Sequence, residues 1–353
     1  MTENSLARGL LNPKTVALVG VSSDPNKNTG RPLRFLKSHG FGGKVIPINP
    51  NRSEVQGIAA YPRLQDVPIR IDHAFIMVPS SQVLNVIADC ISAKVRIATI
   101  YSDGFAETGS KGAELQAEIL DLAQKGNLRV IGPNSMGIIN TRARLTLTIS
   151  AFLDKSLLKT GHIGVISQSG SIIGTMMSRG AARGISYSSL VSIGNECDVT
   201  VGELVDLMVD DPDTEIILLF LEAIRDPELL ALSARRAFAL GKPIIAYKLG
   251  RSEVGRELAL SHSGAIAGPD ASADAFFRHN AILRADMLET LFELPPLVIK
   301  AQPTITRRIA VLTTTGGGAG MVVDRLGTFG VEIVPPSPAL RSRMAGFNID
   351  LGD

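Results

Sequence analysis

Near-continuous apolar runs alternate with helical patterns along most of this chain. In its first part, five apolar runs occupy residues 15–21, 44–48, 72–78, 95–101 and 128–131. Helical patterns at residues 81–93 and 111–125 separate some of these runs. Parallel strands that are covered on both faces have this composition, because neither face meets water. The order predicts right-handed βαβ units and an open, doubly wound α/β sheet.

The same alternation resumes after residues 141–161, which we interpret as a linker or crossover. Further strands are expected at residues 162–166, 186–193, 215–221 and 243–249, with helices at 171–183, 201–209 and 228–240. Three prolines within residues 295–303 indicate a second linker, and a strand, a glycine-rich turn and a helix follow it. One βαβ unit cannot bury its own sheet, so this last part is either truncated or packed against the domain before it. We therefore predict tandem doubly wound domains at 1–140, 141–300 and 301–353, the last of them incomplete.

Charge and cysteine content exclude several classes of protein. The formal net charge is +2 and no basic run occurs, so nothing draws the chain to nucleic acid or to a membrane. The N-terminus has no apolar signal core, and no apolar run approaches the ~20 residues that span a bilayer. Cys90 and Cys197 are too few for a disulfide scaffold and fit a reducing cytoplasm. No spacing of Cys and His suggests a metal site.

A first candidate ligand site follows the first strand, which ends at Gly20 and continues into Ser22 and Ser23. A glycine there lets backbone amides meet an anion at the start of the next helix. The dinucleotide fingerprint G-x-G-x-x-G is absent, since the next glycine is Gly30, and this argues against a dinucleotide oxidoreductase. An ordinary surface loop with a structural glycine is the alternative.

Turn-rich polar segments follow the next four strands as well. They contain Pro50, Arg52, Val78, Pro79, Asp103, Gly104 and Asn134. Ligands of open α/β sheets bind beyond the carboxyl ends of the strands, so these segments together could line one pocket. Arg52 could pair with a phosphate through its fork of donors. Each loop taken alone fits an ordinary turn better than a site.

A second candidate site begins where a strand runs into a helix, at Ser167, Ser169 and Gly170. Free amides at the helix start, with hydroxyls beside them, would form a cradle for phosphate, although a serine N-cap without a ligand fits equally well. Further along, His262 has serine on both sides and glycine two places later. Small neighbours give a phosphoryl or acyl-phosphate group access to an imidazole that is largely neutral and nucleophilic at pH 7. On spacing alone, such a loop histidine is functional less often than not.

Four motifs in a fixed order are more specific than any single one. They are Gly-Pro-Asn-Ser at 132–135, Ile-Ser-Gln-Ser-Gly at 166–170, Gly-Asn at 194–195 and Ser-His-Ser-Gly-Ala-Ile-Ala-Gly at 261–268. Together they resemble the nucleoside-diphosphate-forming acyl-CoA synthetases, which include succinyl-CoA synthetase and the ADP-forming acetyl-CoA synthetases. The resemblance covers roughly residues 10–300. It implies a CoA-binding Rossmann-like domain, then a flavodoxin-like ligase domain that carries a phosphohistidine, then the start of a third ligase domain.

The resemblance also implies roles for individual residues. His262 becomes the phosphorylated histidine, Glu222 orients it, and Ser167, Ser169 and Gly170 hold the phosphate. A carboxylate that accepts the other ring N–H fixes the tautomer and raises the basicity of the attacking nitrogen. The CoA contacts implied by the motifs are Gly20, Ser22, Ser23, Pro50, Arg52, Val78, Pro79, Asp103, Gly104 and Asn134.

The implied reaction interconverts acyl-CoA, ADP and phosphate with a carboxylic acid, CoA and ATP. Nothing in this sequence resembles the ATP-grasp domain that holds the nucleotide in this family. ADP or ATP with Mg²⁺ is therefore expected on an ATP-grasp β subunit or on a missing C-terminal domain, within a hetero- or homo-oligomer. A non-catalytic CoA-binding or regulatory module is the alternative. The acyl acid and the choice between ADP and GDP stay open.

Overall fold

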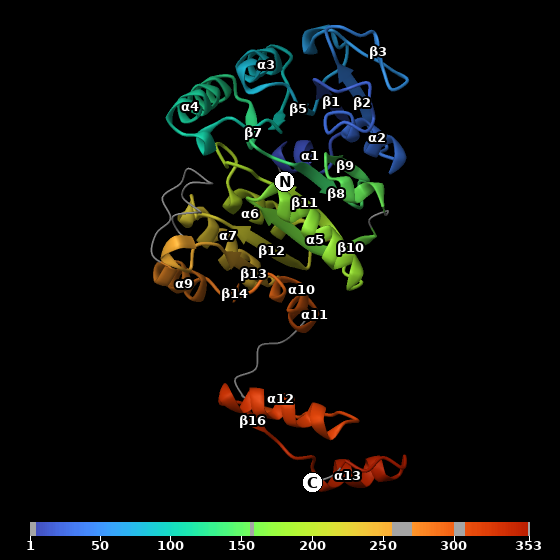
Figure 1. Ribbon diagram of the computed structural model, residues 1–353, viewed down its shortest axis with the longest axis vertical. Coiled ribbons are helices and arrows are strands. Elements are labelled where there is room, and N and C mark those ends of the chain that lie inside the picture. The colour runs from blue at the N-terminus through green and yellow to red at the C-terminus, as the bar shows by residue number, and fades with distance from the viewer. Residues whose placement is uncertain (1–4, 156–158, 256–269, 300–307, 352–353) are drawn as a thin grey trace. The chain divides into compact units, whose positions relative to one another are not determined.

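The computed structural model describes residues 5–155, 159–255, 270–299 and 308–351 (Figure 1). The chain divides into two compact units, Met1–Ile299 and Lys300–Asp353. Within the first unit, two large sheets correspond to the two complete α/β domains that the alternation predicts. No helix of the described ranges combines the length and the apolar character needed to cross a membrane.

The first domain is built on a parallel sheet of order β2-β1-β5-β6-β7. Its strands are β1 (Thr15–Val19), β2 (Lys44–Ile48), β5 (His73–Ile76), β6 (Ile97–Ile100) and β7 (Arg129–Ile131). Its helices are α1 (Ser5–Leu11), α2 (Arg31–Ser38), α3 (Ser80–Ser92) and α4 (Ser110–Lys125). The connections between these elements contain the short strands β3 (Glu54–Val55) and β4 (Ile58–Ala59) and the short 3₁₀ helices η1 (Leu64–Asp66) and η2 (Ala106–Thr108). The strand order reverses between β1 and β5, which makes the switch point where ligands bind in such sheets.

Both faces of this sheet are buried, which explains the continuous apolar runs. Along β1, Val16 and Leu18 pack in one core cluster, and Ala17 and Val19 pack in the other. The first cluster includes side chains of α1 and α2, and the second includes side chains of α3 and α4. Successive strand residues point to opposite faces, so two helical layers require an apolar residue at every position.

The second domain has a sheet of order β14-β13-β12-β10-β11-β8-β9. Its strands are β8 (Gly137–Asn140), β9 (Leu145–Thr148), β10 (Thr160–Ser167), β11 (Tyr187–Ser192), β12 (Ile216–Leu221), β13 (Ile244–Lys248) and β14 (Ile282–Ala285). The helices are α5 (Gly170–Ala182), α6 (Val201–Asp210), α7 (Pro227–Ala239), α9 (Asp270–His279), α10 (Thr290–Glu293) and α11 (Pro295–Val298), with η3 (Ala151–Asp154). Strands β10 to β14 run parallel, and the hairpin β8–β9 adds two antiparallel strands beside β11.

The interpretation of residues 141–161 as a linker is wrong. Strand β9 and the start of β10 fall in this stretch, and all four residues of β9 are buried. The hairpin adds to the second sheet although β8 directly follows the first domain, so a division after residue 140 separates its two strands. The short sequence Leu-Thr-Leu-Thr gives a weaker strand signal than the longer apolar runs, because threonines alternate with the leucines.

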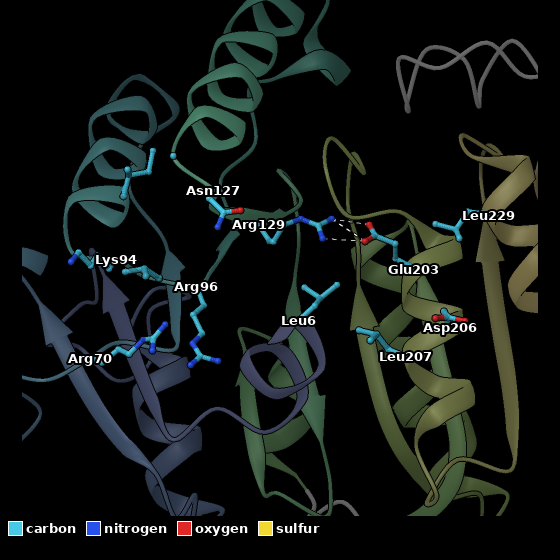
Figure 2. Close-up of a pocket in the computed structure, with 13 residues that line it drawn as sticks. Leu6, Arg70, Lys94, Arg96, Asn127, Arg129, Glu203, Asp206, Leu207 and Leu229 are labelled. Atoms are coloured by element: carbon cyan, nitrogen blue, oxygen red, sulfur yellow. Dashed lines mark hydrogen bonds and ion pairs between the residues drawn. The ribbon is translucent and has the colours of Figure 1, made fainter. Parts of the chain in front are cut away.

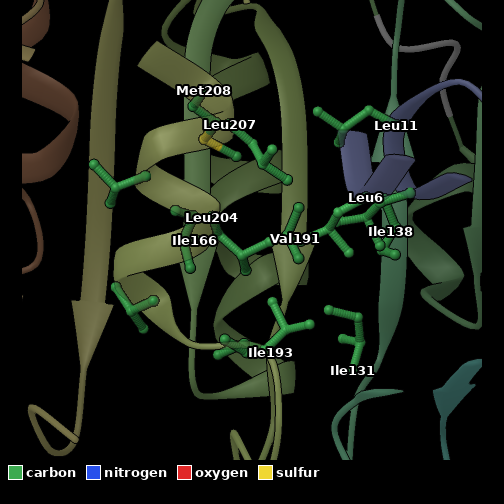
Figure 3. Close-up of a cluster of buried hydrophobic side chains, with 14 of the residues drawn as sticks. Leu6, Leu11, Ile131, Ile138, Ile166, Val191, Ile193, Leu204, Leu207 and Met208 are labelled. Atoms are coloured by element: carbon green, nitrogen blue, oxygen red, sulfur yellow. The ribbon is translucent and has the colours of Figure 1, made fainter. Parts of the chain in front are cut away.

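A continuous core joins the two domains. Figure 3 shows Leu6 and Leu11 of α1 beside Ile138 of β8, with Val191 of β11 and Leu207 of α6 in the same cluster. All five side chains are buried. Helix α1 therefore packs against both domains, and apolar burial holds them in one arrangement.

The second unit is one βαβ element followed by a helix. It consists of β15 (Arg308–Ile309), α12 (Gly316–Thr328), β16 (Glu332–Ile333) and α13 (Pro338–Ala345), and the two short strands pair in parallel. Leu312, Met321 and Phe329 are exposed. This agrees with the expectation that one such element cannot bury its own apolar surface.

Candidate functional site

The five strands of the first sheet run parallel, so their carboxyl ends lie at one edge, where the segments with the predicted CoA contacts follow them. Hydrogen bonds connect neighbouring segments there. The amide of Gly20 donates to the carbonyl of Ile48 at 3.1 Å, and the amide of Asn134 donates to the carbonyl of Ser102 at 2.9 Å. The structure therefore brings the ends of β1, β2, β6 and β7 together.

Gly20 lies at the switch point and cannot be replaced without strain. Its φ is +80°, and a Cβ atom would lie 2.9 Å from Cγ1 of Val78 and 3.0 Å from the carbonyl oxygen of Met77. Gly104, which follows β6, has φ +95°, and its Cβ would lie 3.0 Å from Oγ of Ser80. Both loops thus pass close to the end of a neighbouring strand. Because glycine has no side chain, their backbone stays open to a ligand.

Other predicted contacts of this edge differ in exposure. Ser22, Val78 and Asn134 are half-buried, whereas the side chains of Ser23, Pro50, Arg52, Pro79 and Asp103 are exposed. Ser22 is already used within its loop, since its hydroxyl accepts the amide of Asp24 at 3.1 Å. Arg52 has no hydrogen bond or ion pair within the described ranges, so its guanidinium has all its donors available for a phosphate.

Glu107, which the sequence reasoning missed, connects this edge to the second domain. Its Oε1 accepts the amides of Gly104 at 2.7 Å and Phe105 at 3.1 Å, and its other oxygen accepts the side-chain amide of Asn195. Partial burial acts to raise the pKa of Glu107, but hydrogen bonds from Asn195 and from backbone amides outweigh it and lower the pKa. The carboxylate is therefore ionised, and it fixes the 104–105 loop against the Gly-Asn motif.

The predicted phosphate cradle lies at the start of α5. Ser167 donates its hydroxyl to the carbonyl of Ser169 at 2.7 Å and accepts the Ser169 amide at 3.1 Å, which fixes the turn. Ser169 is the N-cap, but its side chain does not cap the helix. The amides of Gly170 and Ser171 meet no acceptor among the described residues. These amides and the helix dipole favour an anion here.

Glu222 is buried at the end of β12, and the side chain of Gln168 holds its backbone. Oε1 of Gln168 accepts the amides of Glu222 at 2.5 Å and Ala223 at 2.9 Å. Its Nε2 donates to the carbonyl of Ala223 at 2.9 Å and to Oε2 of Glu196 at 2.6 Å. Lys248 donates to the carbonyl of Glu222 at 3.2 Å. The Glu222 loop is thus fixed from two sides.

Glu196 is the second acidic residue that the sequence reasoning missed. It is buried, and its Oε1 accepts the amide of Val201 at 2.7 Å. Burial raises the pKa of Glu196 to about 7, although the hydrogen bonds from Val201 and Gln168 oppose the rise. The one available signal was its position directly after the Gly-Asn motif.

One small pocket collects three of the four motifs. It is lined by Asn134, Gln168, Gly194, Asn195, Glu222, Ala223 and Arg225. Gly194 has φ +63°, and a Cβ there would lie 2.1 Å from the carbonyl oxygen of Pro133. The amide of Asn195 donates to that carbonyl at 2.8 Å. The Gly-Asn loop is therefore docked directly on the Gly-Pro-Asn-Ser segment of the first domain.

The fourth motif includes His262, and it lies outside the described residues. Elsewhere in the chain, within the described ranges, no group of three or more His, Cys, Asp or Glu side chains could hold a metal ion.

Two family models match successive parts of the chain. Residues 14–141 match a CoA binding domain, and residues 160–298 match the succinyl-CoA ligase like flavodoxin domain. The first match covers the sheet edge described above, and the second covers the start of α5 and Glu222.

Curated relatives match over most of the chain. An ADP-forming acetate–CoA ligase of Methanocaldococcus jannaschii is 37% identical over 313 residues, a match that covers 88% of this chain and 43% of the relative. Subunit alpha of the ADP-forming acetate–CoA ligase II of Pyrococcus furiosus is 31% identical over 322 residues, with 91% of this chain and 69% of the relative covered. The chain thus spans less than half of the length of the first relative.

A solved structure shares the fold over nearly the whole chain. It is the dinucleotide forming acetyl-coenzyme A synthetase 1 of Ca. Korarchaeum cryptofilum in complex with phosphate and ADP. The TM-score is 0.89 at 36% sequence identity, and the match covers 98% of this chain and 75% of that one.

Proposed function

The chain belongs to the nucleoside-diphosphate-forming acyl-CoA synthetase family, and on that premise we propose that it is the CoA-binding, phosphohistidine-carrying part of an acid–thiol ligase. The reaction interconverts acyl-CoA, ADP and phosphate with a small carboxylic acid, CoA and ATP. One observation carries this proposal: Asn134, Gln168, Asn195 and Glu222 come from separate segments of the sequence and line a single pocket.

The edge of the first sheet suits CoA. Gly20 and Gly104 keep the loops close to the neighbouring strand ends. The exposed Arg52, which pairs with no residue that the structure describes, offers a fork of donors to a phosphate of CoA. Asn134 follows the last strand of this edge and also lines the pocket with Glu222. CoA bound along the edge would therefore end beside the phosphate cradle of the second domain.

The cradle and the pocket serve phosphoryl transfer. The amides of Gly170 and Ser171 would bind the oxygens of the transferred group, which needs positioning and charge stabilisation more than covalent help. His262 would take the phosphoryl group on one ring nitrogen, either from an acyl phosphate with release of the carboxylate or from ATP with release of ADP. Glu222 would accept the N–H of the other ring nitrogen, which sets the tautomer. The bonds from Gln168 to the Glu222 loop support such a positioning role.

The nucleotide would be supplied by an ATP-grasp β subunit or by a further C-terminal domain, which would also hold Mg²⁺. In support, the Pyrococcus furiosus relative is a subunit alpha. We place the complex in the cytoplasm as a hetero- or homo-oligomer, and the two free thiols of Cys90 and Cys197 fit that compartment.

The test is thioester formation by the purified chain with its ATP-grasp partner, CoA, Mg-ATP and a panel of small carboxylic acids. We expect ligase activity that His262→Ala abolishes, while His162→Ala retains it because that side chain is exposed at the start of β10. CoA binding by titration calorimetry should survive in both variants. If the chain binds CoA but forms no thioester with any acid, it is a non-catalytic CoA-binding module.

A further inference from the structure

A second cavity lies at the opposite end of the first sheet from the proposed CoA edge. It has a volume of about 730 Å³ and opens between the two domains of the first unit. Arg70, Lys94, Arg96 and Asn127 precede β5, β6 and β7, so this wall is formed at the amino ends of those strands. Helix α6 of the second domain contributes Glu203, Asp206 and Leu207 to the other wall (Figure 2).

The acidic side chains of this cavity already have partners. Arg129 donates to Glu203 at 2.8 Å and to Asp198 at 3.0 Å, an ion-pair network that crosses between the domains. Asp206 pairs with Arg236 of α7. The acidic wall is therefore neutralised from within the protein.

The basic wall is not neutralised in the same way. Arg70 and Lys94 are exposed, and neither side chain has a hydrogen bond or ion pair with any described residue. Nε of Arg96 is buried without a hydrogen-bond partner and lies 3.9 Å from Oδ1 of Asp72. The other oxygen of Asp72 is occupied by the backbone amide of Lys14 at 2.9 Å. Arg96 therefore keeps a buried donor without a hydrogen-bond acceptor, which is unfavourable. Arg70 and Lys94 add two cations that no described acid neutralises.

We propose that this cavity binds a phosphorylated small molecule of nucleotide size. Two guanidinium groups and one ammonium group suit phosphate, because a guanidinium can donate two parallel hydrogen bonds to its oxygens. Leu6, Leu207 and Leu229 line the same cavity and offer apolar contact to the organic part of the ligand. The volume falls within the range of small-molecule sites. A ligand here would contact both domains and stabilise their mutual arrangement.

The test uses ADP as the probe, titrated calorimetrically into the full chain at low salt, once without CoA and once with CoA. CoA fills the proposed site at the other edge but is itself a nucleotide derivative, so the ADP binding that is lost when cavity residues are replaced reports the cavity. We expect saturable binding that inorganic pyrophosphate displaces. Arg70→Ala and Lys94→Ala should each weaken ADP binding roughly tenfold, and both side chains are exposed enough to be removed without unfolding the chain.

The matched control is Arg63→Ala, an exposed arginine of the same domain that pairs with Asp89 and does not line the cavity. It should leave ADP affinity unchanged. The proposal is overturned if ADP does not bind at millimolar concentration in the absence of CoA, or if the Arg70→Ala/Lys94→Ala double variant binds it as well as the original chain. Neither result decides the ligase proposal, because that proposal is tested separately by thioester formation and by His262→Ala.

Discussion

At the end of β12, the side-chain amide of Gln168 makes the kind of backbone hydrogen bonds that a neighbouring strand would make. It accepts the amides of Glu222 and Ala223 and donates to the carbonyl of Ala223, so three backbone groups depend on one side chain. All of these groups are buried. Glutamine suits this position because its amide combines an acceptor and a donor in one planar group.

Replacing Gln168 by Ala should therefore destabilise the chain and displace Glu222. Buried backbone groups left without partners cost about 1–3 kcal/mol each, partly offset if water enters. We expect urea unfolding to show a loss of about 2–4 kcal/mol, together with slower phosphorylation of His262. Gln65→Ala is the matched control, because Gln65 is exposed and its side chain hydrogen-bonds Asp89 and no other described residue. Equal stability of the two variants would show that Gln168 has no such role.

Glu196 gives the stability of the chain a defined pH dependence. Its pKa in the folded chain is about 7, above the usual 4.5, so between these values the folded state holds a proton that the unfolded state has released. Its contribution is complete below about pH 4.5 and is lost as the pH rises through about 7. The glutamine in Glu196→Gln does not titrate, so this variant lacks the pH-dependent contribution. Between pH 5 and pH 8 the stability of this variant should rise relative to the original chain by up to about 3 kcal/mol, measured by urea unfolding at each pH. A constant difference across that range would contradict the assignment.

The sequence predicts site residues where a motif marks them, and it gives no signal for residues whose role depends on tertiary contacts. Gly20 and Glu222 follow predicted strands and could be placed directly. Glu107 and Glu196 look like ordinary loop acids in the sequence. Their roles come from Asn195 and Gln168, which reach them from distant segments.

At the scale of elements, the loop after β11 connects the two domains. The amides of Asn195, Cys197 and Val199 donate to carbonyls of the segment 130–133 at 2.8, 3.0 and 3.2 Å. This backbone pairing places the Gly-Asn motif against the Gly-Pro-Asn-Ser motif. This close pairing requires a residue without a side chain at position 194.

Gly194→Ala should break this docking. The Cβ would lie 2.1 Å from the carbonyl oxygen of Pro133, in addition to the strain of φ +63°. Gly184→Ala is the matched control, since Gly184 has φ +72° and nothing within 4 Å of its Cβ position. We expect the control to lose about 1 kcal/mol of unfolding free energy and Gly194→Ala to lose about 2–4 kcal/mol. If both variants lose the same amount by urea unfolding, the close approach is not a constraint.

The hairpin β8–β9 shows why element boundaries were harder to predict than element types. Strands buried on both faces were found from their composition. The hairpin pairs antiparallel with β11, a strand that comes some 40 residues later, and no local pattern reports that pairing. The extent of the second sheet was therefore not accessible from the sequence.

At the scale of the whole molecule, the two complete domains and their shared core lie within Met1–Ile299. The alternation of strands and helices predicted both domains and a third, incomplete element. The part after residue 307 carries exposed apolar side chains such as Met321 and Phe347.

A chain that ends at Ile299 should therefore keep its affinity for CoA. All the proposed CoA contacts precede residue 140, and they are held by the two domains of the first unit. Titration calorimetry should give dissociation constants for the shortened and the full chain that agree within about twofold, which is less than 0.5 kcal/mol. Loss of CoA binding, with the helical circular dichroism of the first unit retained, would show that the second unit takes part in the site.

In the proposed mechanism, His262 carries a phosphoryl group between the thioester site and a nucleotide on a partner. The most direct measurement is mass spectrometry, under conditions that preserve phosphohistidine, of the chain incubated with its ATP-grasp partner and Mg-ATP. We predict one acid-labile phosphoryl group on His262, less of it in Glu222→Gln and none in His262→Ala. Thioester formation by the complex with no phosphoryl group on His262 at any time point would contradict this account.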